Sequence, residues 1–142
     1  MKFLLLLLLP ACAVSQDIPK NTNVIKVSGT SFGKVMNTLL DSNYVIEKSD
    51  KEYQTITTGW KDVCKDCIPQ IQLYIRIKDS TATVTGKWRS VGDIFGMASK
   101  RQEENATLFE IENVKAKVPR ICFSRMQRMA KAFGRELVYI KQ

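Results

Sequence analysis

The sequence predicts an α+β fold in which two helices pack on one face of an antiparallel β-sheet of five to six strands. Residues 71–89 alternate between apolar and polar side chains, which is typical of a half-buried hairpin. Residues 32–40 and 119–133 carry apolar side chains at helical spacing, which is typical of helices that bury one stripe. With the remaining β-prone runs, the expected order is strand, helix, four strands, an irregular segment, helix and strand.

The hairpin at 71–89 determines its own register. A two-residue turn at Asp79 and Ser80 places Lys78 opposite Thr81. The inward residues then meet in four pairs: Ile77 with Ala82, Ile75 with Val84, Leu73 with Gly86, and Ile71 with Trp88. A shift by one residue would turn the whole apolar set toward solvent. The isoleucine side of this hairpin therefore needs a cover, which the two helices can supply.

A strand and a helix are expected before this hairpin. The strand spans 23–27 and ends at Ser28 and Gly29. Thr30 or Ser31 then caps a helix that ends at 41–43. Its apolar stripe comprises Phe32, Val35, Met36, Leu39 and Leu40.

A second hairpin is expected from 44–48 and 53–60, which are β-prone runs joined by a polar turn. We place Tyr44 and Ile46 on its inner face together with Ile56 and Trp60, whereas Val45 favours the opposite facing. Residues 62–69 then form a loop that leads into the central hairpin.

The last third of the chain predicts an irregular segment, a helix and a strand. Residues 90–117 are weakly periodic, with a short strand expected at 107–111. Pro119 opens the helix and Gly134 ends it. The apolar stripe of this helix comprises Cys122, Met126, Met129, Ala130 and Phe133, and residues 136–140 form the final strand.

The N-terminus predicts export. Lys2 is followed by seven consecutive apolar residues and then by small residues, which is the pattern of a signal peptide. Seven apolar residues are too few to cross a bilayer, which needs about 20. We therefore divide the chain into a signal peptide at 1–16, a tether at 17–22 and a single α+β domain at 23–142.

Two cleavage sites fit this leader. Residues 9–12 resemble a bacterial lipobox, which implies that Cys12 becomes lipid-modified and N-terminal, although Pro10 departs from the usual pattern. Alternatively, Ala11 and Ala13 form an ordinary small-x-small signal, and Cys12 is removed with the leader. We favour lipidation at Cys12, which would associate the protein with a membrane through its lipid.

The segment from the first strand to residue 60 resembles a known domain family. A helix led by Phe32 precedes the run 44–50, Tyr-Val-Ile-Glu-Lys-Ser-Asp. This order is similar to that of the BamC-like helix-grip domains of bacterial envelope lipoproteins. The resemblance covers about 23–60 and implies an envelope lipoprotein with a helix-grip fold.

The composition excludes several kinds of chemistry. The chain contains no histidine, which removes the usual neutral-pH general base and the commonest metal ligand. No catalytic residues, metal site or cofactor are expected. The formal charge of +8, from 22 basic and 14 acidic residues, falls to +7 without Lys2 and favours acidic partners. Export argues against nucleic acid, so an envelope protein or an anionic lipid or glycan is the expected kind of partner.

The cysteines at 64 and 67 predict a local disulfide. A redox-active pair normally precedes a helix, whereas Ile68, Pro69 and a strand follow Cys67. A structural disulfide suits an oxidising compartment, and redox catalysis is the alternative. Cys122 lies on an apolar helix stripe and is expected to be a buried thiol, with pairing to a loop cysteine left open.

Two surfaces carry candidate binding residues. Along one side of the second helix lie Arg125, Arg128 and Lys131. The polar side of the central hairpin carries Tyr74, Arg76, Lys87 and Arg89. Each set could contact phosphate or carboxylate groups, and each could equally be a solvated face.

Taken together, these features predict an exported, lipid-anchored, non-enzymatic binding or assembly component of the bacterial cell envelope. It would be periplasmic, anchored in the outer membrane, or secreted. The alternatives are an envelope thiol-redox protein that uses Cys64 and Cys67, and a carrier of small apolar ligands with a pocket between the first helix and the sheet.

Overall fold

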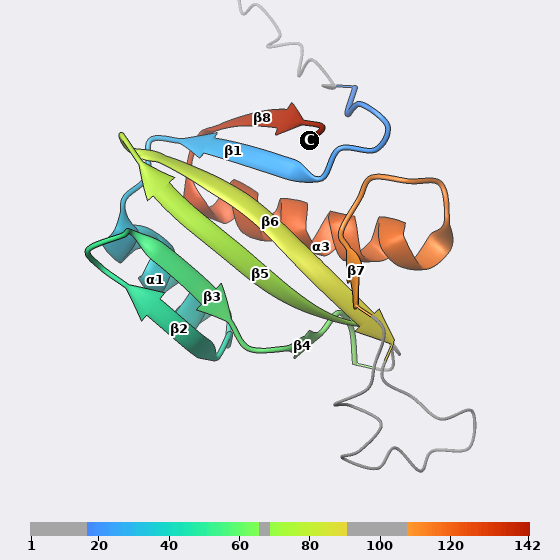
Figure 1. Cartoon of the computed structure of the whole chain (residues 1–142), viewed down its shortest axis with the longest axis horizontal. Helices are drawn as coiled ribbons and strands as arrows, with labels where there is room; N and C mark the ends of the chain where they lie inside the picture. The colour runs from blue at the N-terminus through green and yellow to red at the C-terminus, as the bar shows by residue number, and fades with distance from the viewer. Residues whose placement is uncertain (1–16, 66–68, 91–107) are drawn as a thin grey trace, which may run out of the picture.

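The computed structural model describes residues 17–65, 69–90 and 108–142. It has two layers, a twisted sheet and a pair of helices behind it (Figure 1). The helices are α1 (Phe32–Asp41) and α3 (Lys117–Phe133), and both lie on the same side of the sheet. Within the described residues, neither helix is both long and apolar enough to span a bilayer.

The sheet is antiparallel throughout and confirms the predicted α+β class. Its main path follows the order β2-β3-β5-β6-β1-β8. The six strands on this path are β1 (Val24–Ser28), β2 (Ile46–Asp50), β3 (Thr55–Thr58), β5 (Pro69–Lys78), β6 (Thr81–Ser90) and β8 (Glu136–Ile140). Two short strands extend it: β4 (Lys61–Asp62) pairs with β5, and β7 (Leu108–Glu110) pairs with β6.

The β5–β6 hairpin has the predicted register at every one of the expected pairs, from Lys78 opposite Thr81 to Ile71 opposite Trp88. Its turn residues Asp79 and Ser80 have φ values of 50° and 58°, as a two-residue hairpin turn that follows the strand twist requires. The isoleucine side is buried beneath the helices, which confirms that the alternating pattern marks one core-facing side.

Helix α1 begins as expected, because the Ser31 side chain accepts a hydrogen bond from the Lys34 amide at 3.3 Å. Val35 and Leu39 are fully buried. Leu40, however, is 52% exposed, so the predicted apolar stripe was too wide. The reason is that α1 crosses the sheet near its edge and presents only a narrow face to the core.

Helix α3 buries the predicted stripe completely, together with Phe123. It starts at Lys117, two residues before Pro119, which is compatible with proline because a first-turn amide has no partner within the helix. It ends at Gly134, as predicted. A side chain at this position would place its Cβ 2.2 Å from the Ser28 carbonyl oxygen, so only glycine lets the helix end pack on β1.

The β2–β3 hairpin differs from the expectation at one residue. Tyr44 and Ile56 are buried and Val45 is 71% exposed, which confirms the inner facing chosen for Tyr44. Trp60 does not join the core. Strand β3 ends at Thr58, and the Gly59 amide donates to the Val45 carbonyl at 2.7 Å, so the alternating pattern stops before Trp60.

Residues 17–22 were predicted as a tether but belong to the folded domain. Ile18 packs against the core and Thr22 is fully buried. The Asn21 amide donates to the Asn113 carbonyl at 2.9 Å. This segment contributes apolar surface and backbone hydrogen bonds to the domain, and a composition-based boundary misses both. The signal peptide at 1–16 and Cys12 lie outside the described residues.

The two segments expected to be irregular each contain a short strand. Strand β4 occupies the start of the loop predicted at 62–69. Strand β7 lies within the short strand predicted at 107–111, and its Phe109 ring stacks on Trp88 with centroids 4.7 Å apart. The residues between β6 and β7, 91–107, lie outside the described part of the chain.

Candidate functional site: a basic groove

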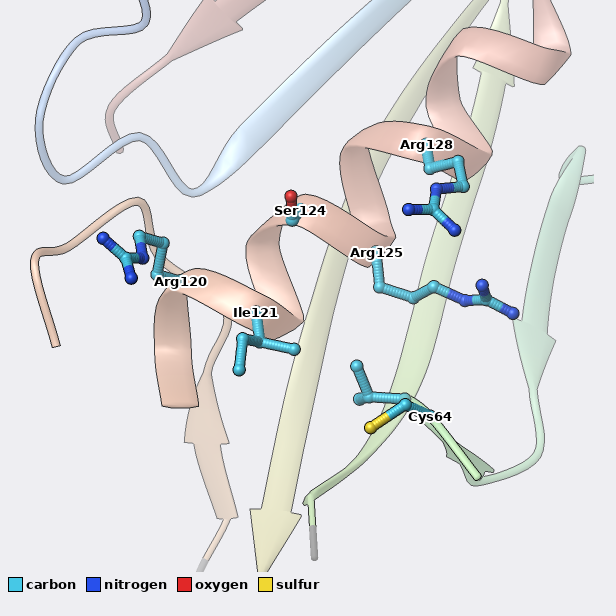
Figure 2. A pocket seen from close by; sticks show the side chains of 7 residues that line it. Cys64, Arg120, Ile121, Ser124, Arg125 and Arg128 are labelled. Carbon is cyan, nitrogen blue, oxygen red and sulfur yellow. The ribbon is translucent and has the colours of Figure 1, made fainter. Parts of the chain in front are cut away.

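A groove of about 400 Å³ runs between helix α3 and the segment that follows β4 (Figure 2). We call it the basic groove. Its α3 wall consists of Arg120, Ile121, Ser124, Arg125 and Arg128, and the opposite wall consists of Val63 and Cys64. Three arginines thus line one surface recess, and Figure 2 shows the Arg125 and Arg128 side chains on one side of it and the Arg120 guanidinium directed away from Cys64.

The helix positions these arginines through its own periodicity. Cys122, Met126 and Met129 are buried against the sheet, so residues to one side of that stripe border the recess. Val63 supplies its buried floor and is held in place by its amide, which donates to the Pro69 carbonyl at 3.2 Å. The recess therefore lies where α3 passes the loop between β4 and β5.

Arg125 is the central residue of the basic groove. Figure 2 shows its side chain extending from α3 past Cys64, toward the strand that leads into β4. Its Nε atom is buried and has no hydrogen-bond partner among the described residues. The Tyr44 hydroxyl is likewise buried without such a partner at hydrogen-bond distance, and it lies close enough to the Arg125 guanidinium for that charge to favour its ionised form. Among residues 17–65, 69–90 and 108–142, no groove arginine forms an ion pair. The ion pair in these residues joins Lys87 to Glu110 on the sheet surface.

A second cation lies beside Tyr44. The Lys61 ammonium donates to the Ser42 and Asn43 carbonyls at 2.9 and 2.8 Å, where it caps the C-terminal end of α1. It also lies 4.8 Å from the centroid of the Tyr44 ring. These contacts hold Lys61 in place near Arg125 and Asp62, the two charged groups that act on it.

The titration behaviour of this cluster follows from burial and charge. Burial raises the pKa of Tyr44 above its usual value, although Arg125 opposes the shift. Burial lowers the pKa of Lys61, Arg125 lowers it further, and Asp62 acts in the opposite direction. Near neutral pH the phenol is therefore uncharged, and the local charge is positive.

Cys64 lines the basic groove and is disulfide-bonded. The predicted partner, Cys67, lies outside the described residues, so this pairing stays a prediction. Cys122 is a buried free thiol, which excludes the alternative pairing with a loop cysteine. Burial raises the pKa of Cys122 to about 11.

The predicted basic helix face is only partly assembled in the groove. Arg125 and Arg128 line it, whereas Lys131 is exposed beyond it and Arg120 takes part instead. The residues of the α3 wall recur every four positions, at 120, 124 and 128 and at 121 and 125, so they lie along one side of the helix. This spacing could have identified Arg120 as a groove residue. No local signal predicted Val63 and Cys64, because tertiary packing brings them to α3.

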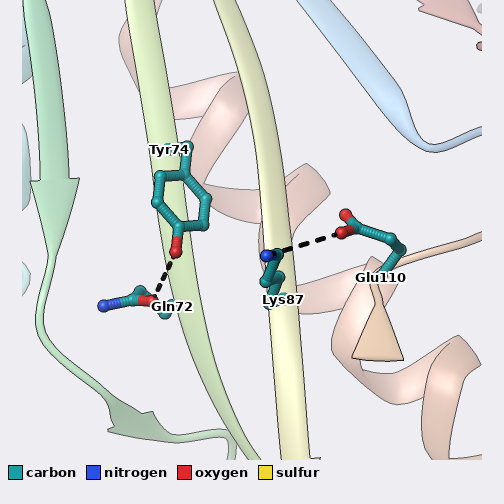
Figure 3. A network of polar contacts seen from close by, with 4 residues as sticks. All are labelled: Gln72, Tyr74, Lys87 and Glu110. Carbon is teal, nitrogen blue, oxygen red and sulfur yellow. Dashed lines mark hydrogen bonds and ion pairs between the residues drawn. The ribbon is translucent and has the colours of Figure 1, made fainter. Parts of the chain in front are cut away.

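The second predicted surface is the polar side of the central hairpin, and it forms as expected. Its polar side chains, however, bond to one another and to neighbouring strands (Figure 3). The Tyr74 hydroxyl donates to Gln72 Oε1 at 2.8 Å, and Lys87 Nζ lies 3.9 Å from Glu110 Oε1. The Arg89 guanidinium donates to Gln70 and lies 4.4 Å from the centroid of the Trp60 ring.

Arg76 is exposed on this same surface. Gln72, on the same side of β5, is buried, and its amide donates to the Glu47 carboxylate. Most polar groups of this surface therefore satisfy one another, whereas the buried Nε atom of Arg125 has no hydrogen-bond partner among the described residues.

No protein-family model matches this chain, and no curated protein matches it.

Proposed function

We propose that this protein is an exported, lipid-anchored, non-enzymatic binding component of the bacterial cell envelope, and that the basic groove binds a phosphate or carboxylate group of an envelope partner. One observation carries the proposal: the groove gathers three arginines, and the central one has a buried Nε atom without a hydrogen-bond partner among the described residues.

The chemistry of arginine supports an anionic ligand. Its planar guanidinium presents donors in a fork that matches carboxylate and phosphate geometry. A buried donor that lacks a partner destabilises a protein, so a site that retains one gains free energy when an acceptor arrives. An anion beside Arg125 would accept from Nε and neutralise the positive charge that Lys61 and Arg125 place around Tyr44.

The leader supports the cellular location. The apolar run before Cys12 favours export, and the lipobox-like sequence favours a lipid at Cys12. The resemblance of residues 23–60 to BamC-like helix-grip domains of envelope lipoproteins favours a role in binding or assembly. A fatty-acid analogue fed to cells should label the protein but not its Cys12→Ala variant, and equal labelling of both would contradict the anchor.

Titration with an anion tests the groove. Inorganic phosphate should shift the Nε–Hε NMR resonance of Arg125 in a saturable manner, and acetate should do the same more weakly. Arg125→Gln should abolish the saturable shifts of neighbouring amides, whereas Arg76→Gln on the sheet surface removes the same charge and should leave them intact. Equal responses from the two variants would reduce the effect to general screening by ions and refute the groove as a site.

A thiol-redox function is the second candidate, and the position of Cys64 favours it. The groove arginines lie beside this sulfur, and nearby positive charge stabilises a thiolate and makes a disulfide easier to reduce. A reduction potential well below about −300 mV would mark a structural bond, whereas a potential near that of redox enzymes would favour catalysis. The apolar-carrier alternative gains no comparable support, since the recess of about 370 Å³ between the start of α1 and the β5–β6 turn is lined mostly by polar residues.

A further inference from the structure

The N-terminal segment joins the domain at one end, where three parts of the chain meet. The Asn21 amide donates to the Asn113 carbonyl, and the Asn113 amide donates back to the Thr22 carbonyl at 2.8 Å. The Asn23 amide donates to the Ile140 carbonyl at 3.2 Å, beside the end of β8. Figure 1 shows the first described residues, the loop before α3 and the end of β8 gathered on the same side.

This end is rich in exposed lysines. We call it the basic end and define it by Lys20, Lys115, Lys117 and Lys141, all of which are exposed. Asp17 and Glu112 are the acidic side chains of the same segments. None of the four lysines forms an ion pair with a described residue.

The opposite end of the sheet shows no such excess. The Thr30 amide donates to the Ser80 carbonyl at 3.1 Å, which holds the start of α1 beside the β5–β6 turn. The β2–β3 and β5–β6 turns, the first turn of α1 and the α3–β8 connection carry four basic and four acidic residues: Lys34, Lys51, Lys78 and Arg135 with Asp50, Glu52, Asp79 and Glu136. The basic end is thus a local asymmetry rather than a reflection of the overall charge.

The distance between a lipid at Cys12 and the domain is short. Four residues, 13–16, separate Cys12 from Asp17. Even a fully extended chain would span no more than about 18 Å over these five steps. A charged surface acts over a screening length of about 8 to 10 Å at physiological ionic strength. An anchor at Cys12 would therefore keep Asp17 within about 18 Å of the lipid, and any chain path shorter than about half that limit would bring the basic end within the screening length of the headgroups.

We infer that the basic end is a docking surface for an anionic lipid bilayer, and that it orients the domain on the membrane. This inference rests on the proposed anchor at Cys12 for its geometry. The lysines gain attraction from acidic headgroups, and the anchor keeps them close enough to benefit. The opposite end, with its balanced charges, faces away from the membrane.

Amine labelling of the full chain tests this orientation. The protein is purified from the cell envelope, its intact mass is measured, and it is incorporated into phosphatidylglycerol-rich or phosphatidylcholine vesicles. Mass spectrometry then follows acylation of individual lysines. In the anionic vesicles, Lys115, Lys117 and Lys141 should react at least about fivefold more slowly than in the zwitterionic ones. Lys34, Lys51 and Lys78 should react at the same rate in both.

Two matched triple variants complete the test. In a Cys12→Ala background, where no lipid holds the protein, changing Lys115, Lys117 and Lys141 to Gln should lower flotation with anionic vesicles about tenfold, whereas changing Lys34, Lys51 and Lys78 to Gln alters the charge equally and should lower it less than twofold. Equal effects, or equal labelling of both ends, would overturn the inference. A mass without lipid would refute the anchor alone, because flotation still reports on the basic end.

Discussion

Replacing Arg125 with methionine should stabilise the free protein and abolish anion binding, two effects of opposite sign. Methionine keeps an unbranched apolar stem but removes the charge and the buried Nε donor that lacks a partner. A buried unsatisfied donor costs about 1 to 3 kcal/mol. After some loss of packing, we expect Arg125→Met to gain about 1 to 2 kcal/mol and to raise the melting temperature by about 3 to 6 °C.

The order of stability should reverse when the anion is present. At a phosphate concentration of about 100 times Kd, a single site stabilises the wild type by about 2.7 kcal/mol and the variant not at all. Urea unfolding in a buffer free of phosphate and sulfate, and again with added phosphate, measures both values. Arg76→Met, on the sheet surface, should change neither. A variant less stable than the wild type without anion would refute the argument that Arg125 is electrostatically uncompensated.

Three further changes probe the fold that presents the groove. Gly134→Ala should cost about 3 kcal/mol in urea unfolding, because its Cβ would lie 2.2 Å from the Ser28 carbonyl oxygen. Lys61→Met should cost about 1 to 2 kcal/mol and speed hydrogen exchange in α1, because two helix-end carbonyls lose their donor. Burial keeps the Cys122 thiol of the folded protein protonated up to a pKa of about 11, whereas the thiol of the unfolded chain loses its proton near pH 9. The free energy of unfolding should therefore fall by about 2 kcal/mol from pH 9 to pH 11.

Each of these changes has a matched control. Gly33 lies in α1, where an added Cβ would meet nothing within 4 Å, so Gly33→Ala should stabilise the protein by about 1 kcal/mol. If Gly33→Ala instead destabilised the protein as much as Gly134→Ala, a general backbone effect and not the contact with Ser28 would explain both results. Lys65→Met changes an exposed lysine and should leave α1 exchange unaltered. Cys122→Ala should flatten the alkaline fall. A smaller fall in the free energy of unfolding should remain above pH 10, because the pKa of Tyr44 is raised in the folded protein. The lowered pKa of Lys61 has the opposite effect and partly offsets this fall.

The sheet core was predictable because its information is local. Alternation along β5 and β6 leaves one register that buries Leu73 and Ile75, and the structure has that register. The apolar stripe of α3 was equally clear. Its five residues recur at helical spacing, and all five are buried: Cys122, Met126, Met129, Ala130 and Phe133. In both cases neighbours in sequence are neighbours on one face.

The groove was not predictable to the same degree, because it depends on where separate elements meet. Arg125 and Arg128 were recognisable on their helix, but the opposite wall of Val63 and Cys64 comes from a segment about 60 residues earlier. The prediction that Trp60 lies in the core was wrong because it extended the strand pattern beyond Thr58, where β3 ends. The prediction that residues 17–22 form a tether was wrong because it rested on their polar composition, which carries no information about the backbone hydrogen bonds that attach them to the domain.

The position of β1 in the sheet has a consequence for how the chain folds. This first strand lies between β6 and β8, so its two neighbours are a strand more than fifty residues later and the final strand of the sequence. Contacts that join distant parts of a chain form late and slowly. A ribosome-bound polypeptide therefore cannot complete its sheet until residue 140 has emerged.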